Sequence, residues 1–577
     1  MKSIKVLGIL ACVLCLGQAL IPAISAQAPT KAAGSNPIVA ISTGQLIGSL
    51  TADGVAFFKN IPFAQPPVGD LRWREPLLAK AWAGVRDATA FGPMCHQSGN
   101  QQLPHAEDCL QLNIWTPKWP MTSSVPVMVW FHGGGNTAGS GVEALFNGET
   151  LARHGVVLVT TNYRLGVFGF FSHPELTKES PHHASGNYGL MDQIEALRWV
   201  QANIARFGGN PVNVTIFGES AGAADVNSLI ASPLTKGLFV RAIAESGPIG
   251  AQTPLADAEK RNVAWAATLG ITGDGDLAKL RAIPDTELQG KLGGGAAGRG
   301  APGAPGARGG AGAPGAPGAR GAVGAPGAPG AQAARGGAGA PGAPGAAPSG
   351  PMQAIVVDGW VLPEAPTKIY ADGRQQKVAL IIGNNSQEMQ GGRGVNSAAD
   401  LRPVISQRFG PLADRVIAAY GLNGEGEPQP DPEIGNVLTQ WTTDSSFRCG
   451  TVQELVWHTA AGNPGYEYQF SRTVHGQEAQ GAPHASEIPF VFGTLPVWQR
   501  MRNYNDSDQQ YAPQMQEYWT NFAKTGDPNG GKLVKWPKFD ATKRAYVDFT
   551  DAGPVAKEGL QRQVCDLFME NQKRQAQ

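Results

Sequence analysis

The sequence predicts an α/β protein whose central sheet is mostly parallel and flanked by helices. Short apolar runs typical of β-strands alternate along the chain with longer stretches that have helical spacing. Parallel strands need crossover connections, and helices usually supply them. A hydrophobic content of 42% and a charged content of 16% suit a chain that buries a large core.

The expected elements follow one another in a regular order. Early strand-like segments alternate apolar and polar residues, and later ones are short apolar runs bounded by glycine or polar residues. One helix is expected at Gly189–Phe207, which is followed by the stop signal Gly-Gly-Asn-Pro, and another at Ala221–Ile230. The expected strands are Ile38–Leu50, Val55–Ala64, Leu112–Trp115, Val125–Phe131, Val156–Thr161, Val212–Phe217, Phe239–Ala244 and Lys377–Ile382.

Residues 293–350 interrupt this pattern. Glycine recurs at every third position over 300–330 and again over 336–345, mostly as Gly-Ala-Pro. A collagen-like triple helix is one interpretation, because only glycine fits at the axis of three intertwined chains. The run is short and lies within a domain, so we favour a disordered low-complexity insertion. It divides the domain into residues 27–292 and 351–577.

The N-terminus is typical of a secretory signal peptide covering residues 1–26. Lys2 and Lys5 precede the apolar run Val6–Leu20, and small residues continue to Ala26, after which we expect cleavage. A lipoprotein processed at Cys12 is the alternative. No other stretch approaches about 18 consecutive apolar residues, so we expect a secreted or periplasmic protein without a transmembrane segment.

The cysteines outside the signal peptide agree with export. An even number in an exported chain suggests two disulfides, and four cysteines allow three pairings. No C-x-x-C pair remains after signal removal, so we expect no metal site, and no cofactor is implied. The cysteines are Cys95, Cys109, Cys449 and Cys565.

The charge balance bears on partners. The chain has 46 Lys+Arg and 46 Asp+Glu, a net charge of zero, which argues against nucleic-acid binding. The oligomeric state stays open.

Gly218–Gly222 fits the pattern G-x-S-x-G between an expected strand and an expected helix. In that setting the pattern predicts a nucleophile elbow, a tight turn that holds the serine in a strained conformation. The hydroxyl then points out of the sheet at the positive end of the following helix. Ser220 is therefore the candidate nucleophile.

The segment His132–Gly135 follows the strand expected at Val125–Phe131 and has the HGGG form of the oxyanion loop of lipases and esterases. Attack on an ester carbonyl creates a negatively charged oxygen, which backbone N–H groups stabilise only where no side chain intervenes. The expected donors are the N–H groups of Gly134, Gly135 and Ala221.

A serine nucleophile needs a base and an acid that orients the base. The histidines downstream of Ser220 are His458, His475 and His484, and chemistry alone does not choose among them. Glu388 follows an expected strand, where an acid would be placed, but Asp358 and Asp444 compete with it.

Further motifs are spread along most of the chain and are highly specific together. They are Phe58–Ala64, Glu107–Asn113, Asn162–Gly166, Gly186–Gln193, Phe217–Gly222 and Trp519–Asn529. With them the chain resembles the type-B carboxylesterase (cholinesterase-like) family of the α/β-hydrolases, over nearly all of residues 35–570 except the insertion. The resemblance implies the α/β-hydrolase fold and cleavage of small-molecule carboxylic esters through an acyl-enzyme.

The resemblance also implies particular roles. His484–Gly493 matches the family's histidine and the acidic-apolar stretch after it, so His484 is the implied base. Gly383–Glu388 matches the segment that ends in the family's acid, so Glu388 is implied, although Met389 stands where glycine is usual. The implied disulfides are Cys95–Cys109 and Cys449–Cys565.

Departures from the family bear on the substrate. Residues 96–108 hold no Trp, Tyr or Phe to bind a choline cation, so choline esters are not expected. Asn136 stands where an aromatic residue is common and is expected to make the pocket more polar. The insertion occupies a region that usually contributes to the gorge rim and acyl-pocket wall, so we expect an open acyl side.

The predicted function is therefore a secreted serine hydrolase that cleaves carboxylic esters. The alternatives are a noncatalytic adhesion module on the same fold and an esterase tethered by a collagen-like structural segment. Lactones and amides remain open as substrates.

Overall fold

The computed structural model describes residues 36–97, 103–250, 252–273, 275–291, 352–392, 394–498 and 503–575. The predicted signal peptide, residues 1–26, and the predicted insertion, residues 293–350, lie outside these ranges. Both therefore remain predictions.

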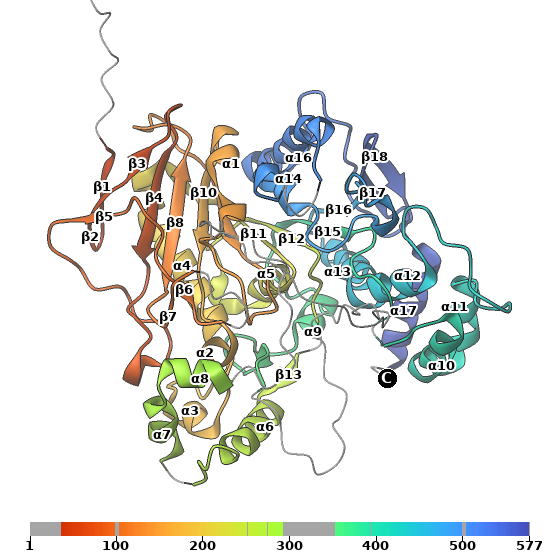
Figure 1. Ribbon diagram of the computed structural model, residues 1–577, viewed down its shortest axis with the longest axis horizontal. Coiled ribbons are helices and arrows are strands. Elements are labelled where there is room, and N and C mark those ends of the chain that lie inside the picture. The colour runs from red at the N-terminus through yellow and green to blue at the C-terminus, as the bar shows by residue number, and fades with distance from the viewer. Residues whose placement is uncertain are drawn as a thin grey trace, which may run out of the picture. The chain divides into compact units, whose positions relative to one another are not determined.

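An eleven-stranded sheet organises the fold (Figure 1). In the spatial order given at the end of this paragraph, each strand between β17 and β10 pairs in parallel with the next. The remaining pairs, at the two edges of the sheet, are antiparallel. The predicted α/β class with a mostly parallel sheet is confirmed. In spatial order the strands are β18 (Gly553–Glu558), β17 (Ala545–Thr550), β16 (Gly465–Phe470), β15 (Ala379–Asn385), β12 (Arg241–Glu245), β11 (Gly209–Glu219), β9 (Val125–Phe131), β10 (Val157–Thr161), β8 (Gln111–Thr116), β4 (Ala56–Pro62) and β3 (Ser49–Leu50).

Helices cover both faces of this sheet, because its central strands are apolar on both sides. On β9, Val127 and Val129 pack in a cluster with α4 and α5, whereas Met128 and Trp130 pack in another cluster with α14 and α16. Successive side chains of a strand point to opposite faces, so a continuous apolar run indicates burial on both. These helices are α4 (Tyr188–Asn203), α5 (Ala221–Ala231), α14 (Ile488–Phe492) and α16 (Asp506–Thr525).

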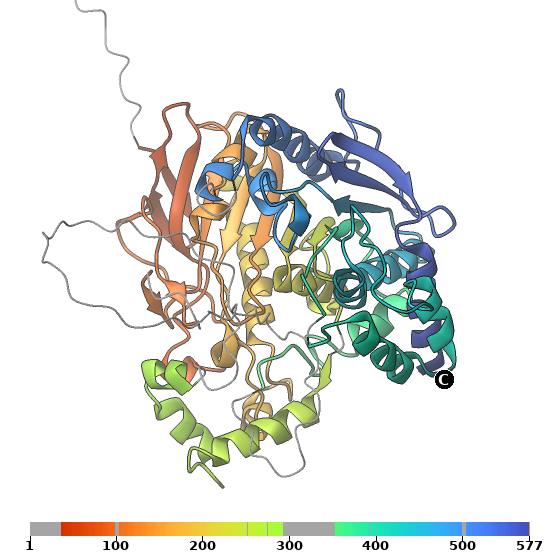
Figure 2. The same cartoon turned by 45° about the vertical axis from the view of Figure 1, so that its right-hand side comes forward.

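A third apolar cluster joins several helices of the second half of the chain. In Figures 1 and 2, α10, α11 and α17 lie side by side. The Cys449–Cys565 disulfide bonds α13 to α17, and a Cys95–Cys109 disulfide closes a loop before β8. The helices of this cluster are α10 (Ala398–Phe409), α11 (Ala413–Ala419), α12 (Val437–Thr443), α13 (Cys449–Ala460) and α17 (Arg562–Gln575).

Shorter elements complete the described part of the chain. Within these ranges no helix combines the length and apolar character needed to cross a bilayer. The other helices are α1 (Glu149–Arg153), α2 (Gly166–Gly169), α3 (Pro174–Glu179), α6 (Leu255–Ala267), α7 (Asp276–Ala282), α8 (Asp285–Lys291), α9 (Pro366–Ala371) and α15 (Leu495–Trp498). The other strands are β1 (Ile38–Ile41), β2 (Gly44–Ile47), β5 (Val85–Asp87), β6 (Met94–Cys95), β7 (His105–Ala106), β13 (Thr253–Pro254) and β14 (Val356–Val357).

The observed elements differ from the expected ones in several places. The segment Ile38–Leu50 is not one strand but three, and β1 and β2 form a separate small sheet with β5 because the chain turns back between them. The helix expected to reach Phe207 ends as α4 at Asn203 and continues as a 3-10 turn. Strands β16 and β17 were not expected, since buried polar residues such as Glu467 and Asp548 interrupt their apolar pattern. Strand β18 was not expected because most of its residues are at least partly exposed.

Candidate active site

Ser220 lies at the sharp turn between β11 and α5. Its backbone has φ 58° and ψ −121°, a conformation that a residue with a side chain rarely adopts. The turn is tight because the neighbouring chain approaches closely: a Cβ at Gly222 would lie 2.1 Å from the carbonyl oxygen of Phe131 on β9. The Ser220 N–H donates to the carbonyl of Glu245 at the end of β12 (2.8 Å), which holds the turn in place.

His484 and Glu388 meet Ser220 at this turn. His484 Nε2 lies 2.9 Å from Ser220 Oγ, and His484 Nδ1 lies 2.6 Å from Glu388 Oε2. Glu388 follows β15 and is buried, and its other oxygen accepts the N–H of Asn385 (2.7 Å). The backbone N–H of His484 donates to the Glu388 carbonyl (3.0 Å), so the two residues are held by main chain as well as side chain.

The competing candidates have other partners. His458 lies in α13 with Nε2 3.0 Å from the Val378 carbonyl, and burial lowers its pKa to about 4. His475 is exposed beside Glu478. Asp444 pairs with the buried Arg448, and Asp358 accepts the backbone N–H groups of Trp360 and Leu362. The structure therefore brings His484 and Glu388, rather than these residues, to Ser220.

The glycines of the HGGG segment lie directly against the turn at Ser220. A Cβ at Gly133 would lie 2.7 Å from the Glu219 carbonyl oxygen and 3.1 Å from Ser220 Cβ. Gly134 has φ 107°, and a Cβ there would lie 2.2 Å from the Ala138 carbonyl oxygen. Only glycine fits this path, which leaves backbone N–H groups free of intervening side chains beside Ser220.

Asn136 does not make the pocket more polar, and that expectation is wrong. Its Nδ2 donates to Asp225 Oδ1 (2.9 Å) on α5, and its Oδ1 accepts from Tyr163 (3.2 Å). The side chain is buried among these groups because each of them needs a hydrogen-bonding partner away from water. Burial also raises the pKa of Asp225 to about 7.

Buried carboxylates that were not among the sequence candidates surround His484. Glu219 Oε1 lies 3.1 Å from His484 Nε2, and Glu487 Oε2 accepts from Asn385 Nδ2 (2.6 Å). Burial, aided by the charge of Glu388, raises the pKa of Glu487 to about 7. Both acids lie within motifs quoted above, but their sequence positions do not reveal that they converge on one imidazole.

These charges change the protonation of His484. Burial alone disfavours the imidazolium, but the negative charges of Glu219 and Glu388 outweigh it and raise the pKa of His484 to about 10. The ring also packs against Phe447, with centroids 5.1 Å apart. Among the residues that the structure describes, no group of three or more His, Cys, Asp or Glu is placed to hold a metal ion.

Comparisons with known proteins agree with this fold. The carboxylesterase family model matches residues 35–290 and 349–568. The fumonisin B1 esterase of Sphingopyxis macrogoltabida is 34% identical over 511 residues, which cover 84% of this chain and 82% of that protein. The para-nitrobenzyl esterase of Bacillus subtilis is 32% identical over 528 residues, covering 88% and 94%.

Solved structures show the same relationship. A structure of a PNB esterase superimposes with a TM-score of 0.73 at 30% identity, covering 92% of this chain and 99% of that one. A carboxylesterase of Geobacillus stearothermophilus gives a TM-score of 0.71 at 30% identity, covering 91% and 99%. The fold is thus that of the α/β-hydrolases. The chain belongs to the carboxylesterase family and is a carboxylic ester hydrolase.

Proposed function

We propose that this esterase is an exported serine hydrolase that cleaves small-molecule esters through an acyl-enzyme on Ser220. The observation that carries the proposal is the pair of hydrogen bonds that link Ser220 Oγ to His484 and His484 to Glu388. A serine, an imidazole and a carboxylate in this order form the arrangement that activates a hydroxyl for attack on a carbonyl.

Each residue has one task in the proposed reaction. His484 Nε2 takes the proton of the Ser220 hydroxyl as its oxygen attacks the ester carbonyl, and later gives that proton to the leaving alcohol. Glu388 accepts a hydrogen bond from Nδ1–H, which keeps the proton of the neutral ring on Nδ1 so that Nε2 acts as the acceptor, and it stabilises the imidazolium that forms. Water then attacks the acyl-enzyme: His484 takes a proton from the water and gives it to Ser220 Oγ as the carboxylic acid leaves.

The charge that develops on the carbonyl oxygen needs its own stabilisation. The proposed donors are the N–H groups of Gly134, Gly135 and Ala221, and the last belongs to the first residue of α5. The N-terminus of a helix carries a partial positive charge that favours an anion there. Fixed donors of this kind contribute typically 10²–10³-fold to the rate.

Export is the second part of the proposal. Support comes from the charged and apolar pattern of residues 1–26 and from the two disulfides, since disulfides persist mainly in oxidising compartments. The experiment for this part is to sequence the N-terminus of the protein secreted by its expression host. We expect it to begin at Gln27.

The decisive experiment is hydrolysis of p-nitrophenyl acetate, butyrate and octanoate by the purified chain and by Ser220→Ala. Fumonisin B1 and a p-nitrobenzyl ester complete the panel, because related esterases carry those substrates in their names. We expect turnover of the p-nitrophenyl esters that disappears in Ser220→Ala, and a fluorophosphonate probe that labels the peptide containing Ser220.

Ser228→Ala is the matched control, because the Ser228 hydroxyl donates to the Ala224 carbonyl of its own helix. It should keep full turnover and probe labelling. Equal turnover by the wild-type chain and Ser220→Ala would show that Ser220 is not the nucleophile. Absence of turnover by a folded wild-type chain would favour a narrow substrate range instead.

The carboxylate of Glu219 should set the pH dependence of the reaction. The proposed base must be neutral, so kcat/KM should rise with pH through an apparent pKa above the ordinary imidazole value of 6.5. Glu219→Gln removes a negative charge 3.1 Å from His484 Nε2. The rising limb of the pH profile should therefore move to lower pH by about one to three units. The measurement is the pH profile of kcat/KM for p-nitrophenyl acetate.

Glu195→Gln is the control for that profile, because Glu195 lies on α4 and pairs with Arg198. The limb of this variant should coincide with that of the wild type. A limb for Glu219→Gln that stays in place or moves to higher pH would contradict the assigned electrostatic role.

A further inference from the structure

A glutamine side chain holds Gly139, which ends the loop that begins with the proposed oxyanion segment His132–Gly135. We call His132–Gly139 the oxyanion loop. Gln97 Nε2 donates to the carbonyl of Gly139 (2.9 Å), and the N–H of Gly139 donates to Gln97 Oε1 (2.9 Å). The amide of Gln97 thus pairs with both polar groups of one backbone residue, as a neighbouring strand would. Gln97 is buried, with 2% of its surface exposed.

Gly139 in turn lies against the residues that precede the proposed oxyanion donors. It has φ 100°, and a Cβ there would lie 2.4 Å from the Gly133 carbonyl oxygen and 2.4 Å from His132 Nδ1. The loop is closed on itself, because the N–H of Ala138 donates to the Gly134 carbonyl (3.1 Å). A shift of Gly139 therefore moves the peptide groups of Gly134 with it.

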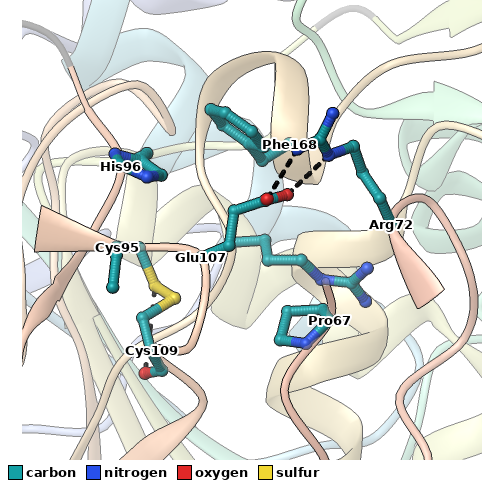
Figure 3. Close-up of a pocket in the computed structure, with 9 residues that line it drawn as sticks. Pro67, Arg72, Cys95, His96, Glu107, Cys109 and Phe168 are labelled. Carbon is teal, nitrogen blue, oxygen red and sulfur yellow. Dashed lines mark hydrogen bonds and ion pairs between the residues drawn. A yellow bond between two sulfur atoms is a disulfide. The ribbon is translucent and has the colours of Figure 1, made fainter. Parts of the chain in front are cut away.

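Gln97 is itself held in place by neighbouring contacts. It follows the Cys95–Cys109 disulfide, and its backbone carbonyl accepts from Gln289 Nε2 of α8 (2.8 Å). The adjacent His96 Nε2 lies 2.8 Å from Asp285, also on α8. Figure 3 shows His96 beside the disulfide, with Glu107 pointing toward Arg72.

The cavity of Figure 3 lies beside the Cys95–Cys109 disulfide and is also lined by His96. Its volume is about 10 Å³, room for about one water molecule. The buried ion pair of Arg72 with Glu107 (2.6 Å) lines it, and Gln97 is not among its lining residues. The cavity is therefore too small for a substrate and separate from the contact between Gln97 and Gly139.

We infer that Gln97 is a positioning residue of the oxyanion loop. Its amide holds Gly139, and through Gly139 it keeps the N–H groups of Gly134 and Gly135 aligned with Ser220. Without that amide, the part-buried N–H and carbonyl of Gly139 lose these hydrogen bonds, and the loop can shift to find other partners. Gln97 itself does not touch the reacting atoms. The inference rests on the proposed function.

The test uses Gln97→Ala and the nearly isosteric Gln97→Glu, which keeps an acceptor for the Gly139 N–H but presents no donor to its carbonyl. A misplacement of about 1 Å at a catalytic group costs on the order of 10²-fold, so we expect kcat for p-nitrophenyl acetate to fall about 10–100-fold. KM should change less than about threefold, because the ground-state carbonyl gains little from the oxyanion donors.

A trifluoromethyl ketone supplies a readout that a purely structural role would not move. It adds to a serine hydroxyl as a tetrahedral oxyanion, so its Ki should rise by the same factor as kcat falls. Rates are normalised to active sites by titration with a fluorophosphonate, which removes any contribution from unfolded protein. Gln289→Ala, which loses one contact to the Gln97 carbonyl, should show a smaller effect in the same direction.

Gln201→Ala is the matched control. Gln201 lies on α4 rather than beside the oxyanion loop. Its Nε2 also donates to two backbone carbonyls, those of Pro211 (2.7 Å) and Leu238 (2.8 Å). Its kcat and Ki should match the wild type even if its Tm falls.

An unchanged kcat and Ki in folded Gln97→Ala and Gln97→Glu would overturn the inference, as would a rise of KM alone. The proposed function would survive either result, provided that turnover still depends on Ser220. Loss of that dependence in the wild type would instead defeat the proposed function itself.

Discussion

Replacing His484 with alanine is expected to lower kcat for p-nitrophenyl acetate by about a million-fold, close to the loss expected for Ser220→Ala. His484 Nε2 lies 2.9 Å from Ser220 Oγ, and its removal leaves the serine proton without an acceptor. The residues of such an arrangement act as a unit, so the double variant Ser220→Ala/His484→Ala should be little worse than either single one. The measurement is steady-state kinetics normalised to folded protein.

A histidine at the surface, also downstream of Ser220, provides the control. His475 is exposed and pairs with Glu478, so His475→Ala should retain the wild-type kcat. A loss of less than about 100-fold in folded His484→Ala would contradict its role as the general base.

Glu388→Gln is expected to lower kcat by about 10⁴-fold while the protein stays folded. Glu388 Oε1 accepts the Asn385 N–H, and Oε2 faces His484 Nδ1. A glutamine keeps the first hydrogen bond only by turning its NH₂ group toward Nδ1. That orientation makes Nδ1 an acceptor and places the imidazole proton on Nε2, where it can no longer receive the proton of Ser220.

Asp358→Asn is the matched control, because this acid accepts the backbone N–H groups of Trp360 and Leu362. It should lower Tm but leave kcat per active site unchanged. The same pair of variants also decides between Glu388 and Asp358, two of the acids that the sequence left open. A 10⁴-fold loss in Asp358→Asn with an active Glu388→Gln would reverse the assignment.

Local features of the site could be predicted from sequence because their causes are local. The G-x-S-x-G turn requires small residues where β9 approaches, and the glycines of the HGGG segment are required by backbone paths that a Cβ would block. The strands of the parallel core were recognisable because they are apolar on both faces. Strands β16 and β17 were not, because residues such as Glu467 are polar and yet buried.

Other features depended on contacts between distant parts of the chain. Asn136 was expected in the pocket, but its place is decided by Asp225 and Tyr163, which the fold brings together beneath the loop. The clamp of Gln97 on Gly139 joins residues 42 positions apart and has no local pattern. Whether a polar side chain faces a pocket or the interior depends on which partners lie within hydrogen-bonding distance.

The sequence by itself therefore determined the α/β class, the sharp turn at Ser220, the glycine loop before it and, through family resemblance, ester hydrolysis with His484 and Glu388 as the expected base and acid. Only the tertiary structure brought His484, 264 residues further along the chain, to the Ser220 hydroxyl and surrounded it with Glu219, Glu388 and Glu487. The physical reason is that glycine requirements and apolar alternation act between near neighbours. Proton affinity instead depends on charges that lie close in space, whatever their separation along the chain.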